Sequence, residues 1–120
     1  MSEQAHWKIT LYTRLDGSSP VAEFIEEQSK RNQSKIFHEL EDLAEFGLMP
    51  RGGAKLRHLE GKLWELRFSG EDLRFRFIYF AHTGRIFVVL HGFCKKTNKT
   101  PERELETARQ RYTDYLKRYN

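Results

Sequence analysis

The chain has 120 residues, of which 38% are hydrophobic and 32% charged, and its net charge at neutral pH is +4. Nine Phe, five Tyr and two Trp exclude a disordered chain, and the longest uncharged apolar runs, residues 77–81 and 86–90, are far shorter than the ~20 residues that cross a membrane. The single cysteine, Cys94, excludes an internal disulfide, and with no zinc-type spacing and no apolar leader we expect one cytoplasmic domain over residues 1–120 without metal or cofactor.

The first half of the chain predicts one strand and two helices. Residues 6–12 alternate between apolar and polar side chains, which is typical of a half-buried strand. A turn over residues 16–20 leads into a helix, with Ser19 as N-cap and Pro20 at the first helical position. Asn32 is the expected cap of a second helix, which Gly47 ends. Both helices are acidic, so we expect a packed hairpin there and not a site.

The second half changes to strands from Lys55 onward. Residues 63–68 and 73–80 alternate, a turn cluster at 69–72 joins them, and residues 86–90 form an apolar run typical of a central strand. A last helix is expected to begin at Thr100 and Pro101 and to pack through an apolar stripe of Leu105, Ala108, Tyr112, Tyr115 and Leu116. The predicted order is β-α-α-β-β-β-α. It indicates an α+β domain with a mainly antiparallel sheet packed against helices, one core and one exposed face.

Basic charge is concentrated in the middle of the chain. Residues 51–99 carry eleven Lys or Arg and four Asp or Glu, whereas residues 1–50 carry five and nine. The spacing places Arg67, Arg74 and Arg76 on the strand face opposite the core, with a Lys/His segment after the last strand. Arginine suits phosphate because its planar fork donates paired hydrogen bonds. The pattern therefore indicates a nucleic-acid partner, and a solvated basic face kept for solubility is the alternative.

Three motifs resemble the phage-derived, HigB-like branch of the RelE/ParE toxin superfamily. They are L-W-E-L-R at residues 63–67, F-R at 75–76 where the family commonly has Y-R, and L-H-G-F-C-K-K-T-N-K-T-P at 90–101. Glu104, Ala108 and Arg111 match the family's last helix. The resemblance covers residues 6–112.

The resemblance implies the toxin of a type II toxin–antitoxin pair. HigB-like members cut messenger RNA in the ribosomal decoding site without a metal, and a helix-turn-helix antitoxin encoded beside them neutralises them. In such cleavage the ribose 2′-OH attacks the adjacent phosphate and leaves a 2′,3′-cyclic phosphate. The protein supplies positioning, charge stabilisation and proton transfer.

The resemblance also implies roles for individual residues. It places Arg67 and Arg76 at the scissile phosphate, and Lys95 and Lys96 at the RNA backbone or the leaving oxygen. His58 and His91 are both candidates for proton transfer near neutral pH, and His91 is the one expected to be catalytic. Glu65 is either a base or the ion-pair partner of Arg67. The best-studied RelE members have a C-terminal tyrosine where this chain has Thr100 and Pro101, so the proton donor is not identified. The expected RNA-binding residues are Lys95, Lys99, Arg74, His58 and Lys55.

Two other functions fit the same sequence. A ParE-like inhibitor of DNA gyrase shares the fold without cutting RNA, although it has no need of converging phosphate ligands. An RNA-binding module is the second alternative, because aromatic side chains between arginines on a sheet could stack bases without cutting them.

Overall fold

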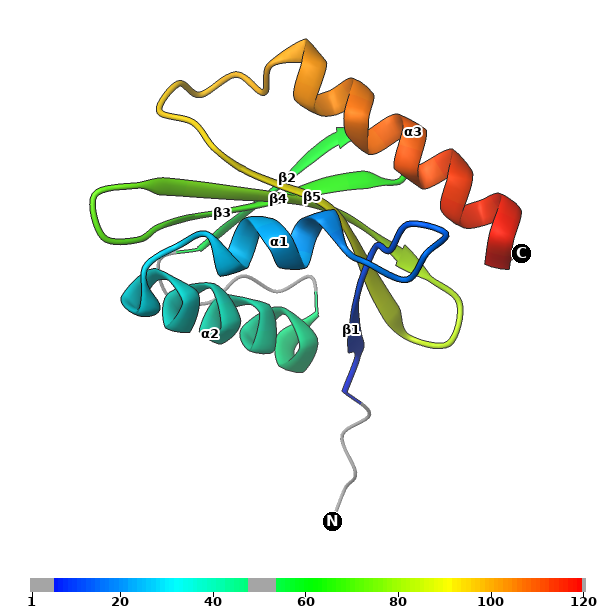
Figure 1. Ribbon diagram of the computed structural model, residues 1–120, viewed down its shortest axis with the longest axis horizontal. Coiled ribbons are helices and arrows are strands. Elements are labelled where there is room, and N and C mark those ends of the chain that lie inside the picture. Colours follow the sequence, from blue (N-terminus) through cyan, green and yellow to red (C-terminus); the bar gives the residue numbers. More distant parts are fainter. Residues whose placement is uncertain (1–5, 48–53, 120) are drawn as a thin grey trace.

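The computed structural model describes residues 6–47 and 54–119 as a five-stranded sheet with helices on both faces (Figure 1). The sheet order is β1-β5-β4-β3-β2; β1 and β5 are parallel and the other three pairings are antiparallel. The expected α+β class and mainly antiparallel sheet are confirmed. The elements are β1 (Lys8–Leu11), α1 (Pro20–Glu26), α2 (Lys30–Phe46), β2 (Lys55–Glu60), β3 (Leu63–Ser69), β4 (Arg74–His82), β5 (Ile86–Cys94) and α3 (Glu102–Tyr119).

One strand is missing from the predicted order. The structure adds β2, an edge strand that pairs with β3, so that the order is β-α-α-β-β-β-β-α. Its alternation of Lys55 and Arg57 with Leu56 and His58 is a strand signal, but the irregular register after His58 interrupts it. The strand matters for the site because it brings a further arginine beside β3.

The helix caps agree with the prediction at two of three positions. The Ser19 side chain accepts from the backbone N–H of Ala22 at 3.1 Å, and Gly47 ends α2 with a positive φ of 63°. The predicted cap Asn32 is wrong, because Ser29 caps α2. Asn32 is buried and instead binds the β3–β4 turn, where it accepts from the Glu71 N–H at 2.7 Å and donates to the Glu71 carbonyl at 3.3 Å.

Both faces of the sheet are covered, which corrects the expectation of one exposed face. Helices α1 and α2 cover one face and α3 the other (Figure 1). Ile78 and Phe80, which share a face with Arg74 and Arg76 at strand spacing, form a second core beneath α3. The predicted stripe of α3 is confirmed: Ala108 is fully buried, and the Phe80 ring lies 4.7 Å from that of Tyr112. In the described part of the chain no helix is both long and apolar enough to cross a membrane.

Candidate functional site

The strand register brings Lys55, Arg67, Arg76 and Phe93 into one row across β2, β3, β4 and β5. Arg67 pairs with Lys55 on one side and with Arg76 on the other, and Arg76 pairs with Phe93. Side chains of directly paired residues lie on the same face about 5 Å apart at Cβ. On β4 the same face continues to Ile78 and Phe80, which form the core beneath α3 together with Phe93, so Arg76 stands at the edge of the region that this helix covers.

Arg57 joins this row from the edge strand. It pairs with Glu65, which shares a face with Arg67 because the two are two residues apart on β3. We call Arg57, Arg67 and Arg76 the arginine cluster. Arg57 was not among the residues predicted for the site, although its spacing of two residues from Lys55 on a strand was a signal that could have found it.

Burial within the cluster is unequal. Arg76 is 4% exposed, so the expectation of a side chain on an exposed face is wrong for this residue, and the Arg67 side chain is 20% exposed. Burial lowers the pKa of Arg76, and the charge of Arg67 lowers it further against the opposing effect of Glu65. Arginine nevertheless stays protonated in proteins. The cluster is therefore a concentration of positive charge that is partly withdrawn from water.

Glu65 is the carboxylate at the centre of the cluster, and it is fully buried. One carboxylate oxygen accepts from Arg67 Nε at 2.8 Å, and the other accepts from the Thr100 hydroxyl at 2.9 Å. Both oxygens thus have partners within the protein. Of the two alternatives left open for Glu65, the geometry matches the ion-pair partner of Arg67. Thr100, expected to start α3, uses its hydroxyl here instead.

The segment after β5 closes one side of the cluster. We call residues 95–101 the basic loop, because Lys95, Lys96 and Lys99 lie in it. Arg57 donates to the Asn98 carbonyl at 3.0 Å and Arg76 to the Lys99 carbonyl at 3.2 Å, while Arg67 also donates to the Asn98 carbonyl. Three arginines therefore hold two successive carbonyls, and this contact fixes the loop beside the row.

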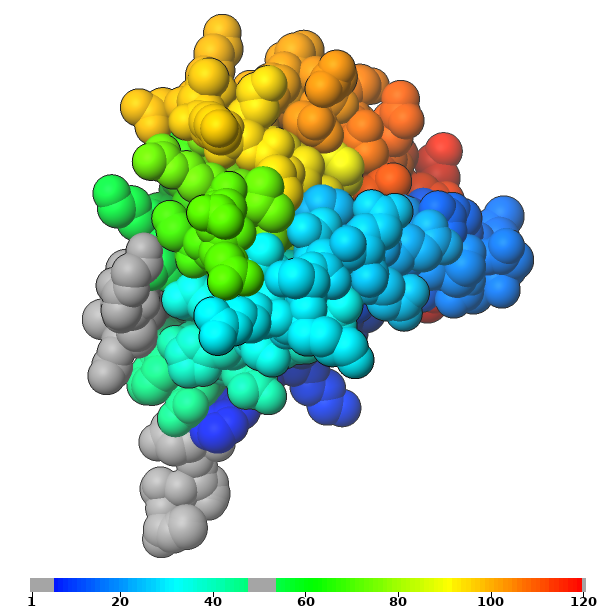
Figure 2. Space-filling view, turned by 60° about the vertical axis from the view of Figure 1, so that its left-hand side comes forward, coloured from blue at the N-terminus to red at the C-terminus, as the bar shows by residue number. Residues whose placement is uncertain are grey.

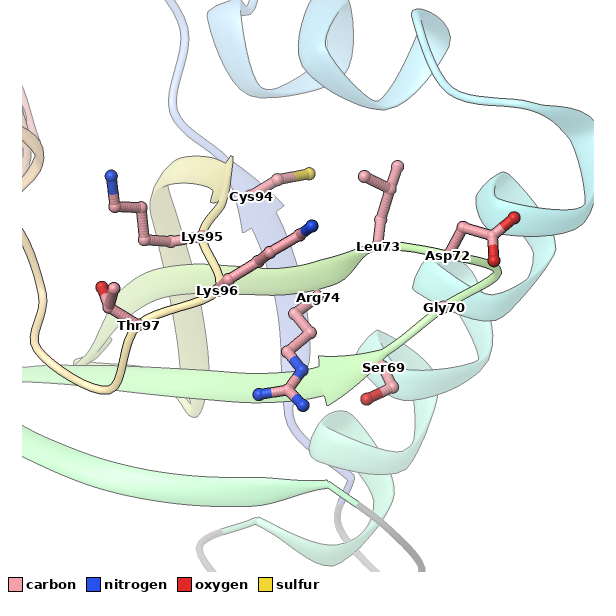
Figure 3. Close-up of a pocket in the computed structure, with 9 residues that line it drawn as sticks. All are labelled: Ser69, Gly70, Asp72, Leu73, Arg74, Cys94, Lys95, Lys96 and Thr97. Atoms are coloured by element: carbon pink, nitrogen blue, oxygen red, sulfur yellow. The ribbon is translucent and has the colours of Figure 1, made fainter.

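Two hollows open between the basic loop and the β3–β4 turn. Figure 2 shows this end of the molecule, with the loop in yellow above the turn in light green. The arginine hollow has a volume of about 280 Å³ and includes Lys55, Arg67, Arg76 and Lys95 in its lining. The turn hollow is larger, about 770 Å³, and lies between the turn and the start of the loop (Figure 3). The two share three lining residues: Ser69, Arg74 and Lys95.

The structure thus brings together seven of the nine residues predicted for the site. Arg74 and Lys95 line both hollows, and the Lys95 N–H donates to the Arg74 carbonyl at 3.2 Å. Lys96 is exposed and lines the turn hollow, and Lys99 is exposed in the basic loop. The seven are Lys55, Arg67, Arg74, Arg76, Lys95, Lys96 and Lys99.

The two predicted histidines have other surroundings. His91 Nε2 lies 2.5 Å from a carboxylate oxygen of Glu104 on α3, and Arg111 donates to its Nδ1 at 3.3 Å. Burial lowers the pKa of His91, and the hydrogen bond that its ring donates to Glu104 opposes this effect by raising the pKa. A neutral ring that donates from Nε2 and accepts at Nδ1 satisfies both contacts. His91 thus fastens α3 to β5.

His58 lies on the opposite face of the sheet. It pairs with Trp64, on the side that α1 and α2 cover, and its Nε2 lies 2.8 Å from the Gly61 carbonyl. The structure does not bring it to the arginine cluster. Alternation from Lys55 and Arg57 already places His58 on the other face together with Leu56.

Comparison with known proteins identifies a family that matches most of the chain. A family model described as "Phage derived protein Gp49-like (DUF891)" matches residues 23–113. The matched segment includes the whole arginine cluster, the basic loop and both hollows. No curated protein matches the chain.

Proposed function

The chain belongs to the family of phage-derived Gp49-like proteins, a family of RelE/HigB-like toxins, and from this we propose that it is an endoribonuclease that cuts messenger RNA on the ribosome. As the toxin of a type II pair, it would be neutralised by a helix-turn-helix antitoxin and would act in the cytoplasm. The observation that carries the proposal is the arginine cluster. Three arginines lie on neighbouring strands around one buried carboxylate, which pairs with Arg67, so an excess of positive charge remains beside an open hollow.

The proposed chemistry is an in-line displacement at phosphorus. The ribose 2′-OH attacks, its proton leaves, the bond to the 5′-oxygen breaks and that oxygen takes up a proton. The products are a 2′,3′-cyclic phosphate and a 5′-hydroxyl. Negative charge grows on the two non-bridging oxygens in the transition state, so donors fixed in advance lower the barrier.

Arg67 and Arg76 are assigned to those oxygens. A guanidinium has five N–H donors, and the contacts of Arg67 with Glu65 and Asn98 use two of them, so donors remain for a phosphate in the hollow. Glu65 holds the Arg67 fork in place. This arrangement suits a transition state because the donors need no reorganisation when the charge develops.

Lys96 is assigned to the leaving oxygen, because its side chain is exposed and reaches the hollow next to the cluster (Figure 3). Lys55, Arg74, Lys95 and Lys99 are assigned to the RNA backbone. We leave His91 and His58 out of the proton-transfer set, since the first fastens α3 and the second lies on the other face. The ribosome would then help to orient the 2′-OH and its proton acceptor.

Induced expression followed by mapping of RNA 5′ ends tests the proposal. We expect new ends within translated coding regions, and 2′,3′-cyclic phosphates on the upstream fragments. Growth arrest with intact messages and broken or tangled DNA would instead support the gyrase inhibitor. Co-purified RNA without new ends would support the RNA-binding module.

A further inference from the structure

The turn hollow is next to the arginine hollow, but its lining is of a different kind. Leu73 and Cys94 form an apolar wall, and Arg74 and Lys96 supply positive charge at its margin. Leu73 is 37% exposed, so its side chain is open to a ligand in the hollow. In Figure 3 the Cys94 thiol and the Lys96 amine both point toward the side where Leu73 stands, whereas the Arg74 guanidinium points away from it.

Leu73 directly precedes β4 and Arg74 is its first residue, and the two side chains point to opposite sides (Figure 3). Arg74 faces the row of basic residues and lines both hollows, while Leu73 lies on the turn side. A single-stranded RNA combines the same two properties, an anionic backbone and flat, largely apolar bases with polar edges. The volume of about 770 Å³ lies in the range of small-molecule sites.

The frame of the turn hollow is fixed before any ligand binds. Asn32 holds both backbone groups of Glu71, and Asp72 has a positive φ of 62°. Gly70 is packed so closely that a Cβ there would lie 2.5 Å from the Phe75 ring and 2.6 Å from Asn32 Oδ1. A preformed pocket loses little conformational entropy when it binds. The β3–β4 turn therefore forms a rigid, preformed side of the turn hollow.

We propose that the turn hollow binds a nucleobase of the RNA whose backbone crosses the arginine cluster. The inference rests on the proposed function and deepens it, because it gives the same site a place for a base next to the place for the phosphate. The base lies against Leu73 and Cys94, which line the hollow.

Cys94 allows a direct test because it is the single cysteine of the chain and lines the hollow. Its thiolate reacts with a maleimide, and because burial raises its pKa the reaction is best followed at about pH 8.5. The full-length protein is labelled alone, with a 2′-O-methyl RNA hexanucleotide, with a fully abasic strand of the same length, and with inorganic phosphate. The 2′-O-methyl group removes the nucleophile, so the strand is bound without being cut. Fluorescence anisotropy measures strand binding separately.

We expect the hexanucleotide at saturation to slow labelling at least tenfold, and the abasic strand and phosphate to leave the rate within twofold. Leu73→Ser should weaken protection severalfold, while Leu15→Ser, at a leucine that is 85% exposed, should not. Equal protection by the abasic strand would overturn the inference, as would RNA that binds without protecting Cys94 or fails to bind. Cleavage of translated message is measured independently, so each of these results can occur with the proposed function intact.

Discussion

Arg67 and Arg76 are direct cross-strand partners on β3 and β4, two like charges at the closest spacing a sheet offers. Like charges placed opposite each other destabilise a strand pair. Glu65 and the carbonyls of Asn98 and Lys99 offset part of this repulsion. One carboxylate cannot neutralise three guanidiniums, and the remaining positive charge is what a phosphate would neutralise. The Arg67–Arg76 pair thus lowers the stability of the folded protein, and an anion bound beside it would relieve the repulsion.

Glu65→Gln should be strongly destabilising, because it leaves Arg67 and Arg76 without their buried counter-charge. Breaking a buried ion pair by removing one partner costs about 3–5 kcal/mol. The matched control is Glu71→Gln, whose partner Arg31 is largely exposed and whose pair is worth at most about 1 kcal/mol. Urea unfolding followed by circular dichroism measures both variants. Equal stability of the two would show that Glu65 does not support the cluster.

Protonation of His91 should lower the free energy of unfolding. Its pKa is lower in the folded state than in the unfolded chain, chiefly because of burial, so the unfolded state binds more protons as the pH falls below about 6.5. Stability that is present above that pH is therefore lost on acidification toward the folded-state pKa. Urea midpoints at pH 7.5 and pH 5 should differ more for the wild type than for His91→Gln. The same difference in both proteins would contradict a buried, neutral His91.

Ala108→Arg should abolish the cooperative unfolding transition at ordinary temperature or lower its midpoint sharply. Ala108 is fully buried between α3 and the sheet, and an unpaired charge forced into that contact costs several kcal/mol, on the order of the whole stability of a small domain. Gln110→Arg, at an exposed position of the same helix, is the control.

Truncation after Thr100 should have a similarly severe effect, because it uncovers Ile78 and Phe80. An unchanged melting temperature for the truncated chain would contradict the second core.

Arg57→Ala should weaken RNA cleavage with little effect on the fold. Arg57 is exposed and donates to the Asn98 carbonyl, so its substitution should change the free energy of unfolding by only about 0.5 kcal/mol. As a member of the arginine cluster, Arg57 is proposed to donate to the same phosphate as Arg67 and Arg76, and loss of one such donor typically slows a reaction about 10²–10³-fold. Cleavage rate and melting temperature are measured together. A variant as active as the wild type would remove Arg57 from the phosphate site and leave it only a contact with the loop.

Periodicity was sufficient to predict most of the fold. Residues 63–68, 73–80 and 86–90 alternate or run apolar without a break. The first and third lie in β3 and β5, and the second lies in β4 except for Leu73, which directly precedes that strand. The spacing also placed Arg67 and Arg76 on one face, and the register confirms it. These signals are local, since they depend on residues two apart in one strand.

The features that local patterns did not predict depend on contacts distant in sequence. Asn32 resembles a cap until the β3–β4 turn, some 40 residues later, is seen to bind it. Arg76 resembles a solvent-facing strand residue, and its burial comes from the basic loop. His91 resembles a proton donor until α3 supplies Glu104 and Arg111 as its partners. Local patterns in a single sequence do not reveal which distant segments make these contacts.

The most direct test of the account is cleavage of one message in a cell-free translation system, with and without ribosomes, by matched variants. Arg67→Lys is the decisive variant, because it keeps a charge beside Glu65 but removes the planar fork. Lys8→Ala, at an exposed position on β1, is the control. We predict that the wild type and Lys8→Ala cut ribosome-bound message and spare free RNA, and that Arg67→Lys cuts about 10²-fold more slowly. Intact message with the folded wild type, equal cutting of free RNA, or a fully active Arg67→Lys would contradict the account.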